Sequence, residues 1–172
     1  MRITTHKTIQ DWDDYIDHLD AVGVRELGNG YFSRVFQHPK LKDVAVKVVA
    51  GDEMYMKFLR FVMKNQGNPY LPRIYHITRH VSKGSTYFIV MMEKLSKLPF
   101  QKYRVWRKRL GTGNSMCQFE AKLQHLSVNC EDSHLRKIFK FIYKNHYYFD
   151  LHGNNVMRRG DQIVIVDPLA DA

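Results

Sequence analysis

Three polar residues in the last quarter of the chain have the types and spacing that phosphoryl transfer requires. Asp150 is followed five positions later by Asn155, and Asp167 ends the apolar run 163–166. Transfer of a phosphoryl group from a metal–nucleotide complex needs one group that orients the attacking hydroxyl and others that hold the metal. We therefore predict that Asp150 is the catalytic base and that Asn155 and Asp167 bind magnesium.

The amino-terminal half contains the pattern of a phosphate-binding hairpin followed by a lysine strand. The segment LGNGYFSRV over 27–35 follows G-x-G-x-x-G-x-V with serine at the third glycine position, and VAVK over 44–47 follows V-A-I-K. A glycine pair alone also occurs in ordinary hairpin turns, but the four elements in this order are far more specific. The predicted nucleotide contacts from this half are Gly28, Asn29, Gly30, Ser33, Val35 and Lys47, the lysine having a catalytic role as well.

Two blocks, Glu26 to Val48 and Tyr148 to Pro168, carry a resemblance to a known family. They contain the loop L-G-N-G-x-F-S and the segment F-D-x-H-x-x-N-x-M, and they resemble the early serine/threonine protein kinases of Teseptimavirus-type (autographivirus) lytic bacteriophages. The resemblance implies ATP and Mg²⁺ as cofactors and host proteins as substrates, in the transcription, RNA-processing or defence machinery. It also implies that the protein acts in the host cytoplasm.

The periodicity of apolar residues, taken with this resemblance, predicts an α+β fold of the minimal protein-kinase-like type. We expect one domain over 1–172: a small antiparallel N-lobe sheet with a preceding acidic helix over about 1–93, and a truncated helical C-lobe over about 94–172. Helices are predicted over 8–21, 52–65, 117–129 and 133–146. Strands are predicted over 24–28, 31–37, 43–49, 73–78 and 86–93.

Three further residues are predicted beside the nucleotide. The strand over 86–93 leads into a hinge, where main-chain groups near Glu93 and Leu95 are expected to meet the adenine. Glu53, at the start of the helix over 52–65, is the candidate carboxylate partner of Lys47. A carboxylate at that position also stabilises the positive end of a helix, so both explanations stay open.

The chain is basic, and one stretch concentrates the excess. Lys and Arg number 27 against 17 Asp and Glu, a formal net charge of +10. Residues 94–109 include seven Lys or Arg and no acid, interleaved with aromatic residues. Such a run is more often a solvated helix face or a docking surface than a nucleic-acid site, so nucleic acid is possible but not favoured. Arg104, Arg107 and Lys108 are the candidate substrate-docking residues.

Other features bear on the location of the protein. No apolar run approaches the ~20 residues needed to span a bilayer, so no membrane partner is expected. Cys117 and Cys130 are too few for a disulfide framework, and the chain begins with no signal-like segment, which fits a reducing cytoplasm. The oligomeric state is not indicated.

Two departures from ordinary protein kinases keep alternatives open. His152 stands where protein kinases usually carry lysine, and D-L-H-x-x-N also resembles small-molecule phosphotransferases of the aminoglycoside and choline kinase type. The sequence ends five residues after Asp167, so we expect no activation segment or peptide-binding platform of the usual kind. The alternatives are a catalytically weak kinase-like binding protein that inhibits a host factor, and a small-molecule phosphotransferase.

Overall fold

A computed structural model describes residues 19, 21–30, 33–50, 53–82, 85–111, 117–145 and 148–170. Over these residues the chain is α+β, with antiparallel strand pairs and four helices. It divides into two compact units, one comprising residues 1–52 and 74–94 and the other 53–73 and 95–172. We call them the sheet unit and the helical unit. In the part of the chain described, no helix is long and apolar enough to cross a membrane.

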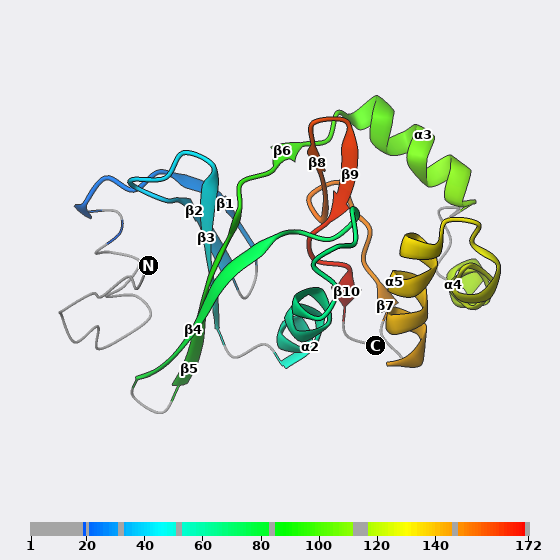
Figure 1. The fold of residues 1–172 in the computed structure, drawn as a ribbon, viewed down its shortest axis with the longest axis horizontal. Coiled ribbons are helices and arrows are strands. Elements are labelled where there is room, and N and C mark those ends of the chain that lie inside the picture. Colours follow the sequence, from blue (N-terminus) through cyan, green and yellow to red (C-terminus); the bar gives the residue numbers. More distant parts are fainter. Residues whose placement is uncertain are drawn as a thin grey trace. The chain divides into compact units, whose positions relative to one another are not determined.

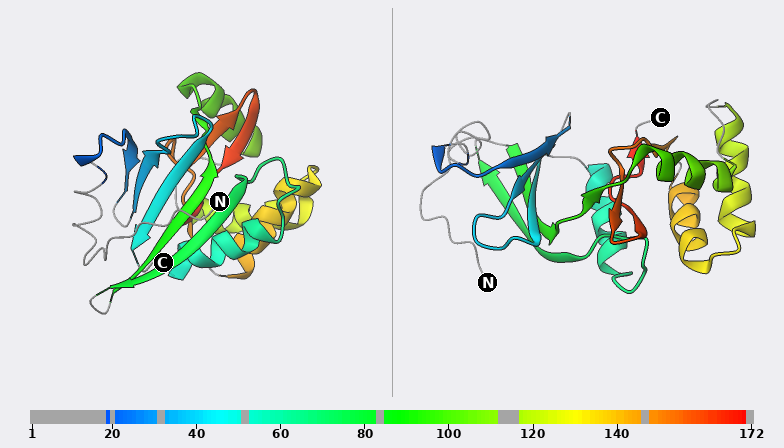
Figure 2. Two further views of the ribbon diagram at one scale, coloured as in Figure 1. Left: turned by 60° about the vertical axis from the view of Figure 1, so that its left-hand side comes forward. Right: turned by 90° about the horizontal axis from the view of Figure 1, so that it is seen from above.

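The sheet unit is built on five antiparallel strands in the spatial order β1-β2-β3-β5-β4 (Figure 1). The valine-rich sequence VAVKVVA forms the central strand β3, as expected for residues that suit a pleated, buried surface. The β4–β5 hairpin extends beyond the other strands (Figure 2). The strands are β1 (Glu26–Asn29), β2 (Ser33–Gln37), β3 (Val44–Ala50), β4 (Ile74–Ser82) and β5 (Ser85–Glu93).

One face of this sheet carries a small apolar core. It consists of Val24, Phe36, Val46 and Val48, each at most 8% exposed, with Leu19 packed against them. Leu19 and Ala21 are the only described residues of the helix predicted over 8–21, and both are helical. The rest of that helix lies outside the described residues.

In the described part of the helical unit there are four helices and two small antiparallel groups of strands, β6-β8-β9 and β10-β7. The helices agree with those predicted to within two residues at each end, except for the helix beginning at 100, which was anticipated only as a basic stretch. The strands of this unit were not among those predicted, because segments of two to four residues show little or no period. The elements are α2 (Glu53–Met63), α3 (Phe100–Leu110), α4 (Cys117–Asn129), α5 (Ser133–Lys144), β6 (Ser96–Lys97), β7 (Tyr148–Phe149), β8 (Val156–Arg159), β9 (Gln162–Ile165) and β10 (Leu169–Ala170).

Asp132 determines where α5, the helix that leads into the predicted catalytic segment, begins. Its Oδ1 accepts hydrogen bonds from the main-chain amides of His134 and Leu135 at 2.9 and 3.2 Å, the arrangement of a helix N-cap. The Tyr70 hydroxyl donates to Oδ2 at 2.7 Å. Partial burial opposes ionisation of Asp132, but these three hydrogen bonds outweigh it and lower the pKa of Asp132. Burial and the same carboxylate raise the pKa of Tyr70 to about 12.

The β8–β9 hairpin is attached to the segment that follows α2. The Arg159 guanidinium donates to the carbonyl oxygens of Pro69 and Leu71 at 3.2 and 3.0 Å, and the Ile165 amide donates to the Tyr70 carbonyl at 2.8 Å. These bonds join residues about 90 positions apart within the helical unit. They hold the hairpin that begins at Asn155 and leads to Asp167.

Candidate active site

The glycine-rich segment forms the β1–β2 hairpin of the sheet unit. The Gly30 amide donates to the Ser33 carbonyl at 2.7 Å, and the Ser33 amide donates back to Gly30 at 3.5 Å. Gly28 pairs with Val35, and Asn29 is the last residue of β1 rather than part of the turn. Hydrogen bonding between the two arms of the hairpin therefore continues to Gly30 and Ser33.

The fold itself does not require glycine at either predicted phosphate-contacting position. Neither Gly28 nor Gly30 has the left-handed backbone that favours glycine. A Cβ added to Gly28 would meet nothing within 4 Å, and one added to Gly30 would approach Ser33 Oγ only to 3.4 Å. Both glycines are exposed. Open space above a bare backbone is what close approach of a phosphate group needs, so this geometry favours the predicted role.

Strand register aligns three of the predicted nucleotide residues of the sheet unit in one row. Gly28 lies opposite Val35, Val35 opposite Lys47, and Lys47 opposite Val90. Directly opposed residues of antiparallel strands share a face, so these four residues lie on one face of the sheet. Lys47 is only 8% exposed, which is unusual for a lysine. The small apolar core described above lies on the other face, since its residues alternate with these along the strands.

The remaining predicted nucleotide residues occupy the end of β5 and the chain beyond it. Glu93 ends β5 opposite Val44, in register with the core face, and is buried. The contact of its main chain with an adenine stays a prediction. Leu95 is the first residue of the helical unit after this strand. Glu53 is exposed in the first turn of α2, also in the helical unit. Its pairing with Lys47 stays a prediction.

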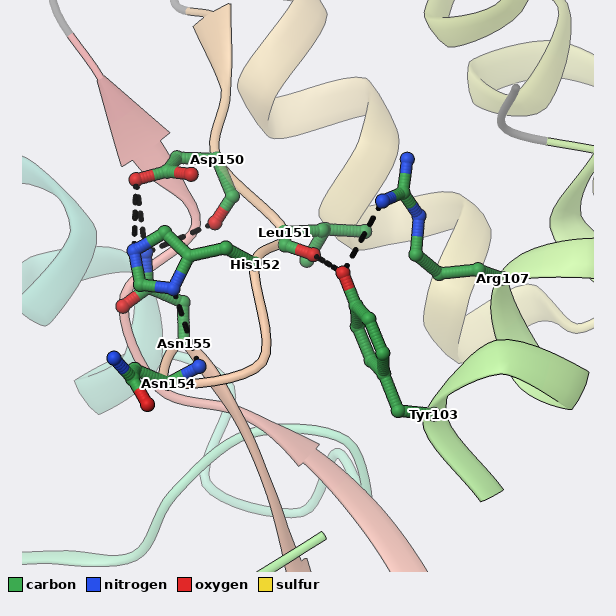
Figure 3. A network of polar contacts seen from close by, with 7 residues as sticks. All are labelled: Tyr103, Arg107, Asp150, Leu151, His152, Asn154 and Asn155. Carbon is green, nitrogen blue, oxygen red and sulfur yellow. Dashed lines mark hydrogen bonds and ion pairs between the residues drawn. The ribbon is translucent and has the colours of Figure 1, made fainter. Parts of the chain in front are cut away.

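In the helical unit, the predicted catalytic base and one of the predicted metal ligands are in direct contact. The side-chain amide of Asn155 donates from Nδ2 to the main-chain oxygen and to Oδ2 of Asp150, both at 3.0 Å (Figure 3). Because both facing atoms are acceptors, the amide must present its NH₂ group to them. Its Oδ1 then faces away from Asp150, and no described residue donates to it. An amide oxygen in that position is a suitable ligand for a hard cation.

Main-chain hydrogen bonds bring Asp167 beside the same pair. The Val166 amide donates to the Asn155 carbonyl at 2.9 Å, and the Asp150 amide donates to the Pro168 carbonyl at 2.8 Å. Asp167 is therefore flanked on both sides by residues bonded to the other two predicted site residues. Its side chain is half-buried.

The side chains of Asn155 and Asp167 suit magnesium better than a metal ion that takes all of its ligands from the protein. Among the described residues, no group of three or more His, Cys, Asp or Glu side chains gathers to hold a metal ion. Magnesium in nucleotide sites takes one or two protein carboxylates, with phosphate and water oxygens completing its shell. The Asp167 carboxylate and the Asn155 amide oxygen are donors of that kind.

His152 makes a second contact with Asp150. Its Nε2 lies 3.3 Å from Oδ2, the same oxygen that accepts from Asn155, and the Asn154 amide donates to its Nδ1 at 3.1 Å (Figure 3). No described residue contacts Oδ1 of Asp150 in this way. The Asp150 side chain is 36% exposed, so Oδ1 can be reached by a substrate.

Tyr103 supports the predicted catalytic segment, and sequence analysis missed it. Its buried hydroxyl donates to the main-chain oxygen of Leu151, between Asp150 and His152 (Figure 3). The same hydroxyl accepts from Arg107 at 3.2 Å, and the guanidinium lies 5.7 Å from the centre of the tyrosine ring. The i, i+4 spacing of these two residues is visible in the sequence, but an aromatic residue at that spacing usually indicates only a core position.

The three predicted docking residues on α3 differ in orientation and exposure. Arg107 is turned toward Tyr103, whereas Arg104 and Lys108 are exposed. Arg104 lies 5.8 Å from the ring centre of Phe100, which is 67% exposed. Of the aromatic residues interleaved with the basic ones, Tyr103 and Trp106 are buried and cannot stack on a base. The surface of α3 is therefore mainly cationic.

A cavity of about 750 Å³ opens elsewhere in the helical unit. It is lined by residues of α3, α4, the start of α5 and the β8–β9 turn, including Trp106, Lys122 and Asp161. None of the predicted catalytic, nucleotide, metal or docking residues lines it. The candidate site is placed by its chemistry and not by the size of this cavity.

Comparison with known protein families agrees with this chemistry. The sequence matches the family model of bacteriophage T7 protein kinase 0.7 over residues 3–170. The chain belongs to this phage protein kinase family. The resemblance inferred from the two sequence blocks is thereby confirmed, and membership implies a transferase that uses ATP, typically with Mg²⁺. Among curated proteins, none matches the chain.

Proposed function

We propose that this protein is an ATP- and Mg²⁺-dependent serine/threonine protein kinase that phosphorylates host proteins in the host cytoplasm. The observation that best supports catalysis is the contact between Asn155 and Asp150. It leaves one carboxylate oxygen open for a substrate hydroxyl and directs an amide oxygen away from Asp150, where a metal ion would take it. A kinase-like protein that only binds its partner has no need of that arrangement.

Each residue has a defined role in this proposal. Oδ1 of Asp150 accepts or orients the proton of the attacking hydroxyl, and Asn155 and Asp167 hold the metal. Lys47 and the β1–β2 hairpin contact the phosphates. Bound Mg-ATP supplies the phosphoryl group and the positive charge that offsets charge building up during transfer. Preference for serine and threonine, and targets in transcription, RNA processing or defence, are proposed from the family resemblance.

Incubation of the purified protein with labelled ATP, Mg²⁺ and host lysate tests the proposal. Label is expected on serine and threonine of host proteins, and Asp167→Ala should remove it. Asp161→Ala is the matched control, because this aspartate side chain is 90% exposed and outside the site. Label found only on small molecules would support the phosphotransferase alternative. Absence of any transfer, with host proteins retained by the immobilised chain, would support the binding protein.

We further propose that host proteins dock on the exposed stripe of α3 formed by Phe100, Arg104 and Lys108, here called the docking stripe. These residues are spaced four apart, so they lie on one side of the helix. Together with the net charge of +10, the stripe favours an acidic region of the substrate. Arg107 is left out because it is engaged with Tyr103.

Charge reversal tests the docking stripe against an equally charged surface. The Arg104→Glu/Lys108→Glu variant should label host proteins less than the wild type, most clearly at low salt, with ATP affinity unchanged. The control is Lys137→Glu/Lys140→Glu, which reverses two exposed charges on α5. Equal loss in both variants would indicate a general effect of net charge and contradict docking on α3.

A further inference from the structure

The contacts of His152 determine where its ring carries a proton. The Asn154 amide donates to Nδ1 at 3.1 Å, so Nδ1 is an acceptor and carries no proton. In the neutral ring the proton must then lie on Nε2, which is 3.3 Å from Oδ2 of Asp150. The ring therefore presents an N–H group to the carboxylate that we assign as the catalytic base.

Burial does not explain this orientation. The His152 side chain is 52% exposed, so it is not a core histidine held by packing. An exposed side chain loses rotamer freedom when it is held in one place, and local polar contacts must offset that cost. The two contacts that do so here are those with Asn154 and Asp150.

We propose that His152 is a positioning residue for Asp150, an inference that rests on the proposed kinase function. Nε2 of His152 and Nδ2 of Asn155 both face Oδ2, which leaves Oδ1 as the oxygen that receives the substrate hydroxyl. Holding the carboxylate in this rotamer keeps the base in the orientation needed for transfer. His152 acts through Asp150 and contacts no reacting atom itself.

Two substitutions separate the two contacts of the ring. In His152→Gln the side-chain NH₂ group is as many bonds from Cα as Nε2 of the histidine. This donor can therefore still reach Asp150. His152→Asn places an oxygen where Nδ1 was, so it keeps the contact with the Asn154 amide but is too short to reach Oδ2. His134→Gln and His134→Asn are matched controls on an exposed histidine of the same unit.

Steady-state kinetics with labelled ATP should distinguish these variants. We expect His152→Asn to lower kcat about 10–100-fold, the effect of removing one hydrogen-bonding partner of a charged group, with KM for ATP unchanged. His152→Gln should recover most of that loss, and both His134 variants should match the wild type. Equal activity of the Gln and Asn variants, whether high or low, overturns the proposal.

A measurement that needs no activity tests the contact itself. Nitrogen NMR of the His152 ring in the intact protein should show the Nε2-protonated tautomer, and its Nε2 signal should shift in Asp150→Ala. If the wild type transfers no phosphate but this tautomer and shift are found, the kinase proposal fails and the contact stands. An Nδ1-protonated ring, or an Nε2 signal that does not change in Asp150→Ala, overturns the inference even in an active enzyme.

Discussion

The candidate residues of the sheet unit and those of the helical unit are held in place by different means. In the sheet unit, Gly28, Val35 and Lys47 are aligned by strand register, which depends on main-chain bonds. In the helical unit, Asp150 lies on an irregular segment, where side-chain hydrogen bonds from Asn155 to Asp150 and from Tyr103 to Leu151 add to a main-chain bond with Pro168. A residue aligned by a ladder can be replaced without moving its neighbours. A residue held by side-chain bonds depends on each of them.

This difference suits the two tasks we assign. In the proposed roles, phosphate groups are contacted by main-chain amides and by one long lysine side chain, which tolerate small displacements. A general base must lie within hydrogen-bond reach of one particular hydroxyl, so its rotamer matters more. Substitutions should therefore separate into those that change binding with little effect on the fold and those that change catalysis and local stability together.

The largest effect is expected from Asp150→Asn, which removes the carboxylate but leaves its main-chain contact with Asn155 possible. Phosphoryl transfer should fall by about 10²–10⁴-fold, the usual contribution of a general base. The ATP affinity measured by calorimetry should stay unchanged, since the predicted metal and phosphate contacts remain. Transfer at the wild-type rate would remove Asp150 from the mechanism and end the contrast between the two units.

A smaller effect is expected from Tyr103→Phe, which tests whether side-chain bonds hold the catalytic segment. The buried carbonyl of Leu151 would lose its donor, at a cost of about 1–3 kcal/mol in the free energy of unfolding. Urea denaturation measures this. The control is Tyr143→Phe, on a tyrosine that is 39% exposed, where a change within about 0.5 kcal/mol is expected. Equal stability of the two variants would show that the Tyr103 hydroxyl is dispensable.

A pair of glycine substitutions sharpens the comparison further. Gly111, the C-cap of α3, has a φ of 65°, and an added Cβ would lie 2.9 Å from the Lys122 ammonium nitrogen, so Gly111→Ala should destabilise the protein by about 1 kcal/mol. Gly28→Ala should change stability by no more than about 0.5 kcal/mol, because the added methyl meets nothing within 4 Å. It should nevertheless weaken ATP binding several-fold, since the methyl occupies space meant for phosphate. Unchanged ATP affinity in Gly28→Ala would contradict the predicted role of the hairpin.

The smallest effect concerns acid and the Asp132 cap of α5. Because the pKa of Asp132 is lower in the folded state, its stabilising effect is present above the ordinary carboxyl pKa of 3.8 and is lost as the pH falls through the folded value. Asp132→Asn can still cap the helix but cannot be protonated in this range. Denaturation curves from pH 5 to pH 2 should therefore fall less steeply for the variant. Parallel curves would exclude Asp132 as a source of acid sensitivity.

The sequence predicted most of the longer elements because their periods are long enough to read, although the 11-residue helix α3 was anticipated only as a basic stretch. Helix α4 was predicted over the 13 residues that it occupies, and β3 was recognised from its valines and the lysine they surround. The types of Asp150, Asn155 and Asp167 were informative because few structural needs place those three residues in that order. Their proximity then follows from one hairpin and two main-chain bonds.

What the sequence could not reveal depends on contacts between distant residues. Tyr103 and Leu151 lie 48 positions apart, and nothing in either segment marks their hydrogen bond. Arg107 was expected to be a docking residue like Arg104, because charge patterning does not tell which way a side chain turns. The tautomer inferred for His152 rests on a single main-chain amide, that of Asn154, which no residue type encodes. These contacts are visible only once the chain is folded.

The β8–β9 hairpin has a consequence for how relatives of this chain can diverge. Its base holds Asn155 beside Val166, whereas its tip, at Gly160 and the exposed Asp161, makes a surface ion pair with Lys102. Extra residues at such a tip cost little and leave the base intact. The number of residues between Asn155 and Asp167 can therefore change during evolution, whereas the distance between their side chains cannot. A family signature written with a fixed interval would overlook members with a longer hairpin.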